Sequence, residues 1–214
     1  MKLYTYFRSS AAYRARIALH YKGVGYEVVS KHLLREGGEH RRDDYLDLNP
    51  QGLVPAIEDE GVVLSQSLAI IEYLEERYPE PPLLPKNPVD RARVRAMALG
   101  IACDIHPLNN LRVLNYLRGE LGQDDAAVQR WYAHWIAEGF RALEELTGRS
   151  TGDGRHCFGS EVTLADVCLV PQMFNARRFH CDVSAYPTLI AICEYLEALP
   201  PFVAAHPQSQ PDAG

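Results

Sequence analysis

A proline-rich segment, EPPLLPKNP at residues 80–88, divides this chain into two parts with different patterns. Proline lacks a backbone N–H and fixes its own φ, so a run of prolines ends helices and strands alike. Short strand-like runs alternate with helical runs before this segment, whereas only helical runs follow it. The sequence therefore predicts an α/β domain over residues 1–80, a linker at 81–87 and an all-α domain over 88–214.

The first part has the order strand, helix, strand, helix, hairpin, helix. We expect these elements at residues 3–6, 10–21, 26–33, 43–50, 54–64 and 67–79. Gly23 follows the first helix, and Asp59, Glu60 and Gly61 separate the two apolar runs of the hairpin. This order fills only about the first 80 residues.

The second part consists of long helical runs. We expect helices at residues 90–121, bent at Pro107, at 124–147, from Thr163 onward with a kink at Pro171, and from Pro187 to Pro200. TLAD, residues 163–166, has the spacing of a capping box between Thr163 and Asp166. The polar tail HPQSQPDAG is expected to be poorly ordered or strapped to the surface.

Charge, hydropathy and cysteine content argue against several kinds of partner and site. The net charge of −6 argues against nucleic acid. No apolar stretch is long enough to cross a bilayer, and MKLYTYFRSS at the N-terminus lacks the apolar core of a signal peptide. The five cysteines form no CxxC pair, so neither a zinc site nor a disulfide framework is expected. We expect a cytoplasmic protein with no metal, no nucleic-acid partner and no membrane contact.

The segment RSSAAYRAR, residues 8–16, lies where the first strand gives way to the first helix. The first N–H groups of a helix lack intrahelical partners and the helix dipole is positive there, so this end favours an anion. The simpler interpretation is that Ser9 or Ser10 is a plain N-cap, and the segment alone favours it. Arg8 and Arg14 favour an anion site, because Arg14 comes one turn after Ser10 and can face the same spot. Such a site would hold a thiolate or a carboxylate.

Two later motifs also allow a structural and a functional interpretation. In VPAI, residues 54–57, Pro55 is either an edge-strand proline or part of a cis Val54–Pro55 bond. The cis bond would leave the Val54 backbone free to pair with an extended peptide. Gln66 and Ser67 open the last helix of the first part, either as a cap or as a site for an α-carboxylate.

Taken together, this order of elements and motifs resembles the thioredoxin-like domain that binds glutathione in glutathione transferases. The resemblance is closest to the zeta class, whose N-terminal motif of a serine pair, a spaced arginine and Arg-Ile-Ala-Leu is matched by Ser9, Ser10, Arg14 and RIAL from Arg16. The match continues through NPQGLVPAI, QSLAIIEYLEERYP, CDIHPLNNLRVLNYL, TLADVCLVPQ and NARRF, so it covers essentially the whole chain. Bacterial isomerases of maleylacetoacetate are the most similar members, and maleylpyruvate isomerases are near relatives.

The resemblance implies roles for residues in both parts. Ser9, Ser10 and Arg8 would be catalytic, with the hydroxyls holding the thiolate of glutathione. Positions that match glutathione contacts are Ser9, His40, Val54, Gln66, Ser67, His106 and Asn110. Arg112 and Arg178 match positions that face substrate carboxylates, and Arg8 would join them to suit a substrate with two charged ends. Without the resemblance, a lone histidine beside a kink is usually structural and a surface arginine is usually only solvated.

For function, the resemblance implies a homodimeric, glutathione-dependent cis–trans isomerase that converts maleylacetoacetate to fumarylacetoacetate in tyrosine and phenylalanine breakdown. Maleylpyruvate is the second possible substrate. Two further functions stay open, namely a conjugating transferase or dehalogenase and a non-catalytic glutathione-binding scaffold. Many zeta-class members carry a cysteine directly after the serine pair, where this chain has Ala11. Thiol–disulfide exchange is therefore the weaker interpretation, whereas isomerisation would use the thiol of glutathione itself.

Overall fold

The chain forms two compact units in a computed structural model that describes residues 1–213. Met1–Pro82 and the chain from Ala198 onward make up the first unit, and Leu83–Glu197 make up the second. The predicted all-α domain over 88–214 was therefore too long, because the chain returns to the first unit at Ala198. The predicted linker at 81–87 is not a free segment either, since Leu83 is buried within the second unit and its C=O accepts the N–H of Leu164 at 2.8 Å.

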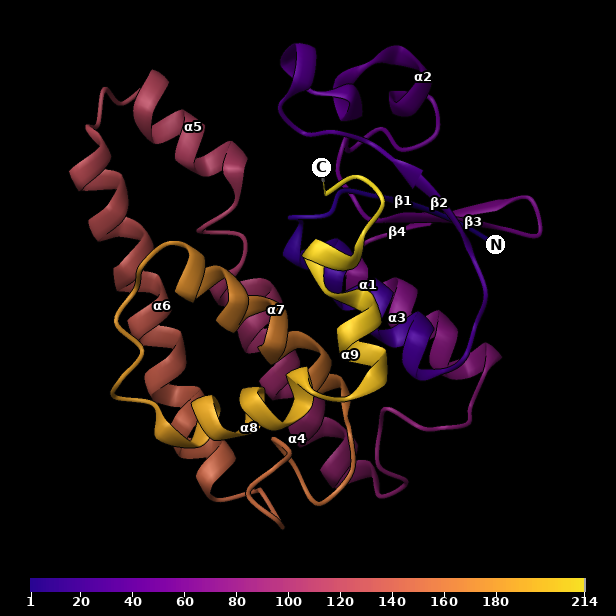
Figure 1. Cartoon of the computed structure of the whole chain (residues 1–214), viewed down its shortest axis with the longest axis vertical. Helices are drawn as coiled ribbons and strands as arrows, with labels where there is room; N and C mark the ends of the chain where they lie inside the picture. Colours follow the sequence, from indigo (N-terminus) through magenta and orange to yellow (C-terminus); the bar gives the residue numbers. More distant parts are fainter. Residues whose placement is uncertain (214) are drawn as a thin grey trace. The chain divides into compact units, whose positions relative to one another are not determined.

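A four-stranded sheet with the order β2-β1-β3-β4 organises the first unit (Figure 1). Its elements along the chain are β1 (Lys2–Thr5), α1 (Ser10–Tyr21), β2 (Glu27–Ser30), α2 (Asp43–Leu46), β3 (Ala56–Asp59), β4 (Val62–Ser65) and α3 (Ser67–Arg77). β1 runs parallel to β2 and antiparallel to β3, so Leu3 pairs with Val28 on one side and with Ile57 on the other. The α/β fold class and the order of the elements are confirmed.

Local chemistry explains the sheet connections. The parallel pair β1 and β2 needs a crossover, which α1 supplies. The hairpin between β3 and β4 turns at Glu60 and Gly61, whose φ values of 49° and 80° match the tight turns that suit the twist of a hairpin. Leu3 and Ile57 of the sheet and Ile17 of α1 are fully buried, so the core of this unit lies between the sheet and its helices.

The polar tail is strapped to the first unit, which is one of its two predicted arrangements. Helix α9 (Pro200–Ala205) packs against α1 (Figure 1). Arg16 of α1 donates from Nε to the C=O of Ala205 at 3.0 Å. Farther along, the N–H of Phe7 donates to Asp212 Oδ2 at 3.1 Å. The side chain of Arg16 thus holds the backbone of the tail, and the backbone N–H of Phe7 holds the carboxylate of Asp212.

The second unit is all helical, as predicted. Its elements are α4 (Pro88–Leu99), a π-helical turn (Gly100–Ile105), α5 (Leu111–Gly119), α6 (Asp125–Gly148), α7 (Leu164–Arg178) and α8 (Pro187–Glu197). The single bent helix predicted over 90–121 is wrong. The chain widens into the π turn, where His106 N–H donates to Ile101 C=O at 2.9 Å, and Asn110 then caps a separate helix.

The predicted capping box starts α7. Asp166 Oδ2 accepts the N–H and the hydroxyl of Thr163 at 2.7 and 2.8 Å, and Oδ1 accepts the N–H of Cys157 at 2.7 Å. Asp166 is fully buried, and this burial raises the pKa of its carboxyl group although the hydrogen bonds oppose the shift. Within residues 1–213, no helix is both long and apolar enough to cross a membrane.

Candidate functional site

Ser9 and Ser10 stand at the first turn of α1. Ser9 is the N-cap, since its backbone is extended and its Oγ accepts the N–H of Ala12 at 3.2 Å. This role uses a lone pair of Oγ, so the hydroxyl proton stays available to donate to an anion. Ser9 is half-buried, whereas Ser10 is only 4% exposed. The N-cap interpretation is thus confirmed, and it is compatible with an anion-binding role for Ser9.

Arg8 and Arg14, the two arginines that favoured an anion site, have different surroundings. Arg8 is exposed, and its guanidinium carbon lies 4.8 Å from the ring centre of Phe7. Arg14 is 1% exposed, and its Nη1 donates to Ser67 Oγ at 3.4 Å. Arg14 therefore joins α1 to the N-terminal turn of α3. Sequence reasoning could not assign this contact because it depends on how the two helices pack.

The Val54–Pro55 peptide bond is cis, which was one of its two predicted forms. β3 begins at Ala56, so Val54 lies just outside the strand. Val54 is 8% exposed and belongs to the same buried cluster as Tyr6 and Phe7, which directly precede Arg8 and Ser9. Packing in this cluster brings the VPAI and RSSAAYRAR motifs together.

Gln66 and Ser67 stand at the start of α3. Gln66 has a φ of 70°, a backbone conformation that residues other than glycine rarely adopt. Such a conformation persists only where the surrounding structure imposes it. Its Nε2 donates to Gln51 Oε1 at 2.8 Å. Sequence reasoning missed Gln51, and the available signal was its place in NPQGLVPAI beside the other motif residues. Ser67, only 6% exposed, is the residue that Arg14 contacts.

His40 lies in a short 3₁₀ helix, Glu39–Arg41, and is 7% exposed. Its Nδ1 is buried and has no hydrogen-bond partner within residues 1–213. Burial, with a smaller contribution from the charge of Arg41, lowers the pKa of the imidazole. His40 is therefore neutral at neutral pH and keeps one ring nitrogen for a further hydrogen bond.

In the second unit, three predicted residues lie around the start of α5. Asn110 is its N-cap, and Oδ1 accepts the N–H of Arg112 at 3.1 Å. His106, four residues earlier, is half-buried at the end of the π turn. The Arg112 side chain is exposed and forms no ion pair within residues 1–213.

Arg177 and Arg178 end α7 with different partners. Arg177 forms an ion pair with Glu197, with 3.0 Å between Nη1 and Oε2. Arg178 places its guanidinium carbon 4.7 Å from the ring centre of Phe179, whose ring stacks on Tyr132 at 4.1 Å between centres. Arg178, and not Arg177, is the predicted substrate residue, and the two neighbouring arginines therefore contact different groups.

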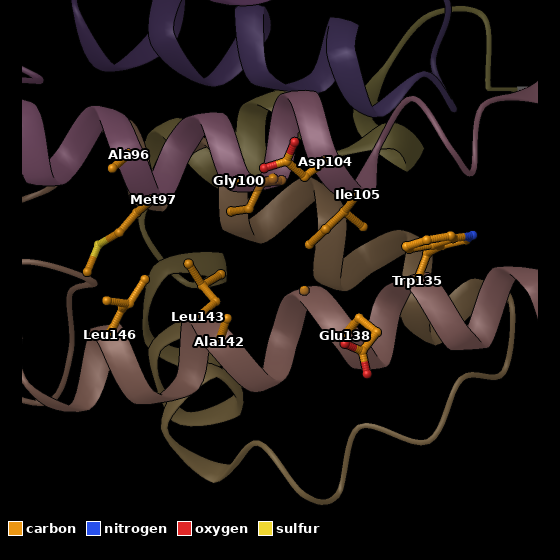
Figure 2. Close-up of a pocket in the computed structure, with 12 residues that line it drawn as sticks. Ala96, Met97, Gly100, Asp104, Ile105, Trp135, Glu138, Ala142, Leu143 and Leu146 are labelled. Atoms are coloured by element: carbon orange, nitrogen blue, oxygen red, sulfur yellow. The ribbon is translucent and has the colours of Figure 1, made fainter.

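A cavity of about 270 Å³ in the second unit is separate from these residues. It lies between α4, the π turn and α6, with Met97 and Leu146 toward one end and Ile105 and Trp135 toward the other (Figure 2). None of the predicted site residues lines it. The cavity is therefore not part of the candidate site.

Comparisons with known proteins identify the family of the chain. Residues 3–82 match the family model for the N-terminal domain of glutathione S-transferases. A probable maleylacetoacetate isomerase of Vibrio cholerae is 53% identical over 211 residues, which are 99% of this chain and 97% of that protein. The holo structure of a maleylpyruvate isomerase, a bacterial zeta-class glutathione S-transferase, is 48% identical with a TM-score of 0.97, and all of both chains is covered. A maleylacetoacetate isomerase from Methylobacterium extorquens AM1, solved with malonate and glutathione bound, is 41% identical with a TM-score of 0.94, again over the whole of both chains.

Proposed function

Because this chain belongs to the zeta class of the glutathione S-transferase family, we propose that it is a glutathione-dependent cis–trans isomerase that converts maleylacetoacetate to fumarylacetoacetate. One observation carries the proposal: a half-buried serine hydroxyl caps the open end of α1, directly after an exposed arginine. That pair offers a hydrogen-bond donor for a thiolate and a cation for a charged substrate. The similarity to a probable maleylacetoacetate isomerase over 99% of the chain supports maleylacetoacetate as the substrate.

The polar groups of the first unit fit glutathione, a peptide with carboxylates at two ends. Ser67 at the start of α3, backed by Arg14, would bind the α-carboxylate of its γ-glutamyl end. The backbone of Val54 would pair with its peptide groups. His40, with a buried Nδ1 that has no partner within residues 1–213, would supply one more hydrogen bond. His106 and Asn110 stay predicted contacts.

When bound, glutathione supplies a thiol whose anion can add reversibly to the cis double bond of the substrate. Ser9 would donate its hydroxyl proton in a hydrogen bond to the sulfur, and the N–H groups at the start of α1 would add their positive potential. Both effects favour the anion of a thiol whose unperturbed pKa is about 8.5. Arg8 would stabilise the negative charge that develops on the substrate's carbonyl oxygen. Arg112 and Arg178 would bind carboxylates and fix the orientation of the substrate.

An isomerisation assay with glutathione tests this function. We expect turnover of maleylacetoacetate only when glutathione is present, with no net consumption of glutathione. Conjugation of a neutral electrophile is measured in parallel. Conjugation without isomerisation would instead support a general transferase, and glutathione binding without any turnover would support a non-catalytic scaffold.

Maleylpyruvate is the second candidate substrate, because a maleylpyruvate isomerase is 48% identical over the whole chain. Both substrates are small acids with the same reactive alkene, so the ratio of their kcat/KM values decides between them. We expect the ratio to favour maleylacetoacetate.

We further propose that the chain forms a homodimer. β4 is an edge strand of the sheet, and Val62 and Val63 on it are 57% and 38% exposed. An edge strand with apolar side chains is a surface that proteins usually cover. Sedimentation is expected to give the mass of two chains at working concentration. The cytoplasmic location stays a prediction.

A further inference from the structure

The turn between β1 and α1 is held on both sides by side chains outside the proposed chemistry. The N–H of Phe7 donates to Asp212 Oδ2 at 3.1 Å, and the C=O of Phe7 accepts from Arg16 Nη2 at 3.0 Å. Phe7 directly precedes Arg8 and Ser9. Both peptide groups of the residue before the site are thus fixed.

Arg16 joins the same turn to the tail. It is fully buried, and its side chain also donates to Thr5 Oγ1 and to the C=O of Ala205, each at 3.0 Å. Burial lowers the pKa of the guanidinium to about 10, so Arg16 stays charged at neutral pH, and Asp212 is the carboxylate that favours this charged form. Asp212 therefore accepts a hydrogen bond from the Phe7 N–H and also attracts Arg16, which donates to the Phe7 C=O.

The position of Arg8 depends on Phe7. The Arg8 guanidinium lies over the Phe7 ring at 4.8 Å, within the range of a cation–π interaction. Phe7 belongs to the buried cluster that also includes Val54, and Ala213 of the tail packs against this cluster. Displacing Phe7 would therefore displace the support of Arg8.

The tail has hydrogen bonds besides the one to Asp212. Arg16 holds the tail at the C=O of Ala205, and Gln210 Nε2 donates to the C=O groups of Ala204 and His206 within the tail at 2.9 and 3.0 Å. Asp212 Oδ1 is buried and has no hydrogen-bond partner within residues 1–213. The hydrogen bonding of this carboxylate in the described chain is thus directed at the Phe7 turn.

We propose that Asp212 is a positioning residue, which acts through Phe7 to hold Arg8 in the orientation that binds and polarises the anionic substrate. The proposal rests on the proposed function, because it assigns Arg8 to the substrate. A side chain near the C-terminus would then contribute to turnover without touching the substrate.

A double-mutant cycle between Asp212→Ala and Arg8→Ala tests the proposal. Since a small misplacement of a catalytic group is costly, we expect Asp212→Ala to lower kcat for maleylacetoacetate about tenfold while the KM for glutathione changes less than twofold. In the Arg8→Ala background, the same substitution should have no further effect, because its target is gone. Asp212→Asn keeps an oxygen that can accept the Phe7 N–H, so it should retain most of the turnover.

The matched control is Ser209→Ala, which removes an exposed hydroxyl of the same tail that donates to the C=O of Val203 at 2.9 Å. It should leave kcat unchanged. Malonate binding to the glutathione-loaded protein, measured by calorimetry over the same cycle, gives a readout that does not need turnover. If wild type binds malonate with the expected coupling but isomerises nothing, the proposed function fails and the positioning role stands.

Additive effects in the cycle would overturn the positioning role while leaving the isomerase function intact. The positioning role would also be overturned if Asp212→Ala lowered the turnover of the anionic substrate and of a neutral electrophile equally. Failure of Asp212→Ala to fold would assign Asp212 to the stability of the fold and would also overturn the proposal. If wild type neither isomerises maleylacetoacetate nor binds malonate, the function and the positioning role both fail.

Discussion

The Ser9 oxygen accepts a hydrogen bond within the protein and keeps a proton for a ligand, so its two roles should separate in mutants. Replacing Ser9 by alanine should lower kcat/KM by an amount typical of a lost charge-assisted hydrogen bond, about 1.5–3 kcal/mol. It should also lower the free energy of unfolding by about 1 kcal/mol, because the cap is lost. Steady-state kinetics and chemical denaturation measure the two effects independently.

Ser10→Ala is the matched control, because Ser10 is buried within the first turn of the same helix. We expect it to cost less activity than Ser9→Ala. Equal and negligible losses of activity in both mutants would leave Ser9 with its capping role alone.

Two histidines of the first unit should make the protein less stable in acid. Burial is the main cause that lowers the pKa of both imidazoles. The charge of Arg41 lowers the pKa of His40 further, and the charge of Arg16 does the same for His20. Between the folded and the unfolded pKa, the unfolded chain binds more protons, so stability rises with pH in this range. The stability that comes from keeping these two histidines neutral is fully present above the unfolded pKa of about 6.5. It is lost as the pH falls through the lowered pKa values of the folded protein.

Unfolding free energies of the glutathione-free protein at several pH values check this dependence. His40→Gln and His20→Gln should each flatten the decline below pH of about 6.5, since the substituted residue cannot bind the proton. An unchanged slope in both variants would assign the acid sensitivity to other groups.

At the same scale, the sequence predicted local backbone features better than the contacts between distant residues. Motif spacing was sufficient to predict a cap at Ser9 or Ser10, of which Ser9 is the cap, and to predict the two possible forms of the bond before Pro55. Both features follow from local backbone chemistry. The contact between Arg14 and Ser67 joins residues 53 positions apart and depends on helix packing. Arg16 appeared only as part of a motif, and its burial against the tail depends on contacts that no local pattern encodes.

Among the helices, the approach of the π turn to α6 depends on Gly139. A Cβ at this position would lie 2.1 Å from Ile105 Cδ1 and 2.3 Å from its Cγ1, and Ile105 is itself buried. Gly139→Ala should therefore force the π turn or α6 to shift, with a loss of about 1–3 kcal/mol in the free energy of unfolding. Chemical denaturation measures this loss.

Gly148→Ala, at the last position of the same helix, is the control. Nothing lies within 4 Å of a Cβ there, so the better helix propensity of alanine should leave stability unchanged or raise it by up to about 1 kcal/mol. Equal stability of the two alanine variants would mean that the π turn tolerates movement away from α6.

The same region shows why element boundaries were harder to predict than element types. Apolar periodicity over 90–121 is helical throughout, and Pro107 correctly marked a disturbance. The π turn and the restart at Leu111 depend on which carbonyl accepts the His106 N–H and on Asn110 as a cap. Both features depend on individual hydrogen bonds, which the spacing of apolar residues does not predict.

For the whole molecule, composition and the proline-rich segment predicted two parts, but not the return of the chain from Ala198 to the first unit. Helix α9 is a short segment, PPFVAA, and its place in the first unit depends on its packing against α1. Contacts such as Arg16 with Ala205 join residues 189 positions apart. Long-range pairing of this kind cannot be obtained from periodicity or composition.

The choice between an isomerase of dianions and a general transferase should be visible in the arginines of the second unit. Arg112 is exposed without an ion pair in the described chain, and Arg178 follows the ion-paired Arg177 at the end of α7. We expect Arg112→Ala or Arg178→Ala to weaken maleylacetoacetate turnover by about 2–4 kcal/mol, as for a lost charged contact. Conjugation of a neutral electrophile and the affinity for glutathione should be kept, because neither needs a cation for a substrate carboxylate.

Arg177→Ala is the control for this comparison, since it removes a neighbouring cation that is already paired with Glu197. An exposed ion pair contributes at most about 1 kcal/mol to stability, so this variant should keep the turnover of both substrates. The decisive quantity is the ratio of kcat/KM for the charged and the neutral substrate in each single variant. A ratio that falls in Arg112→Ala and Arg178→Ala but not in Arg177→Ala assigns the two arginines to the substrate. If both activities fall in parallel, the arginines support the fold instead, and the preference for a dianion needs another source.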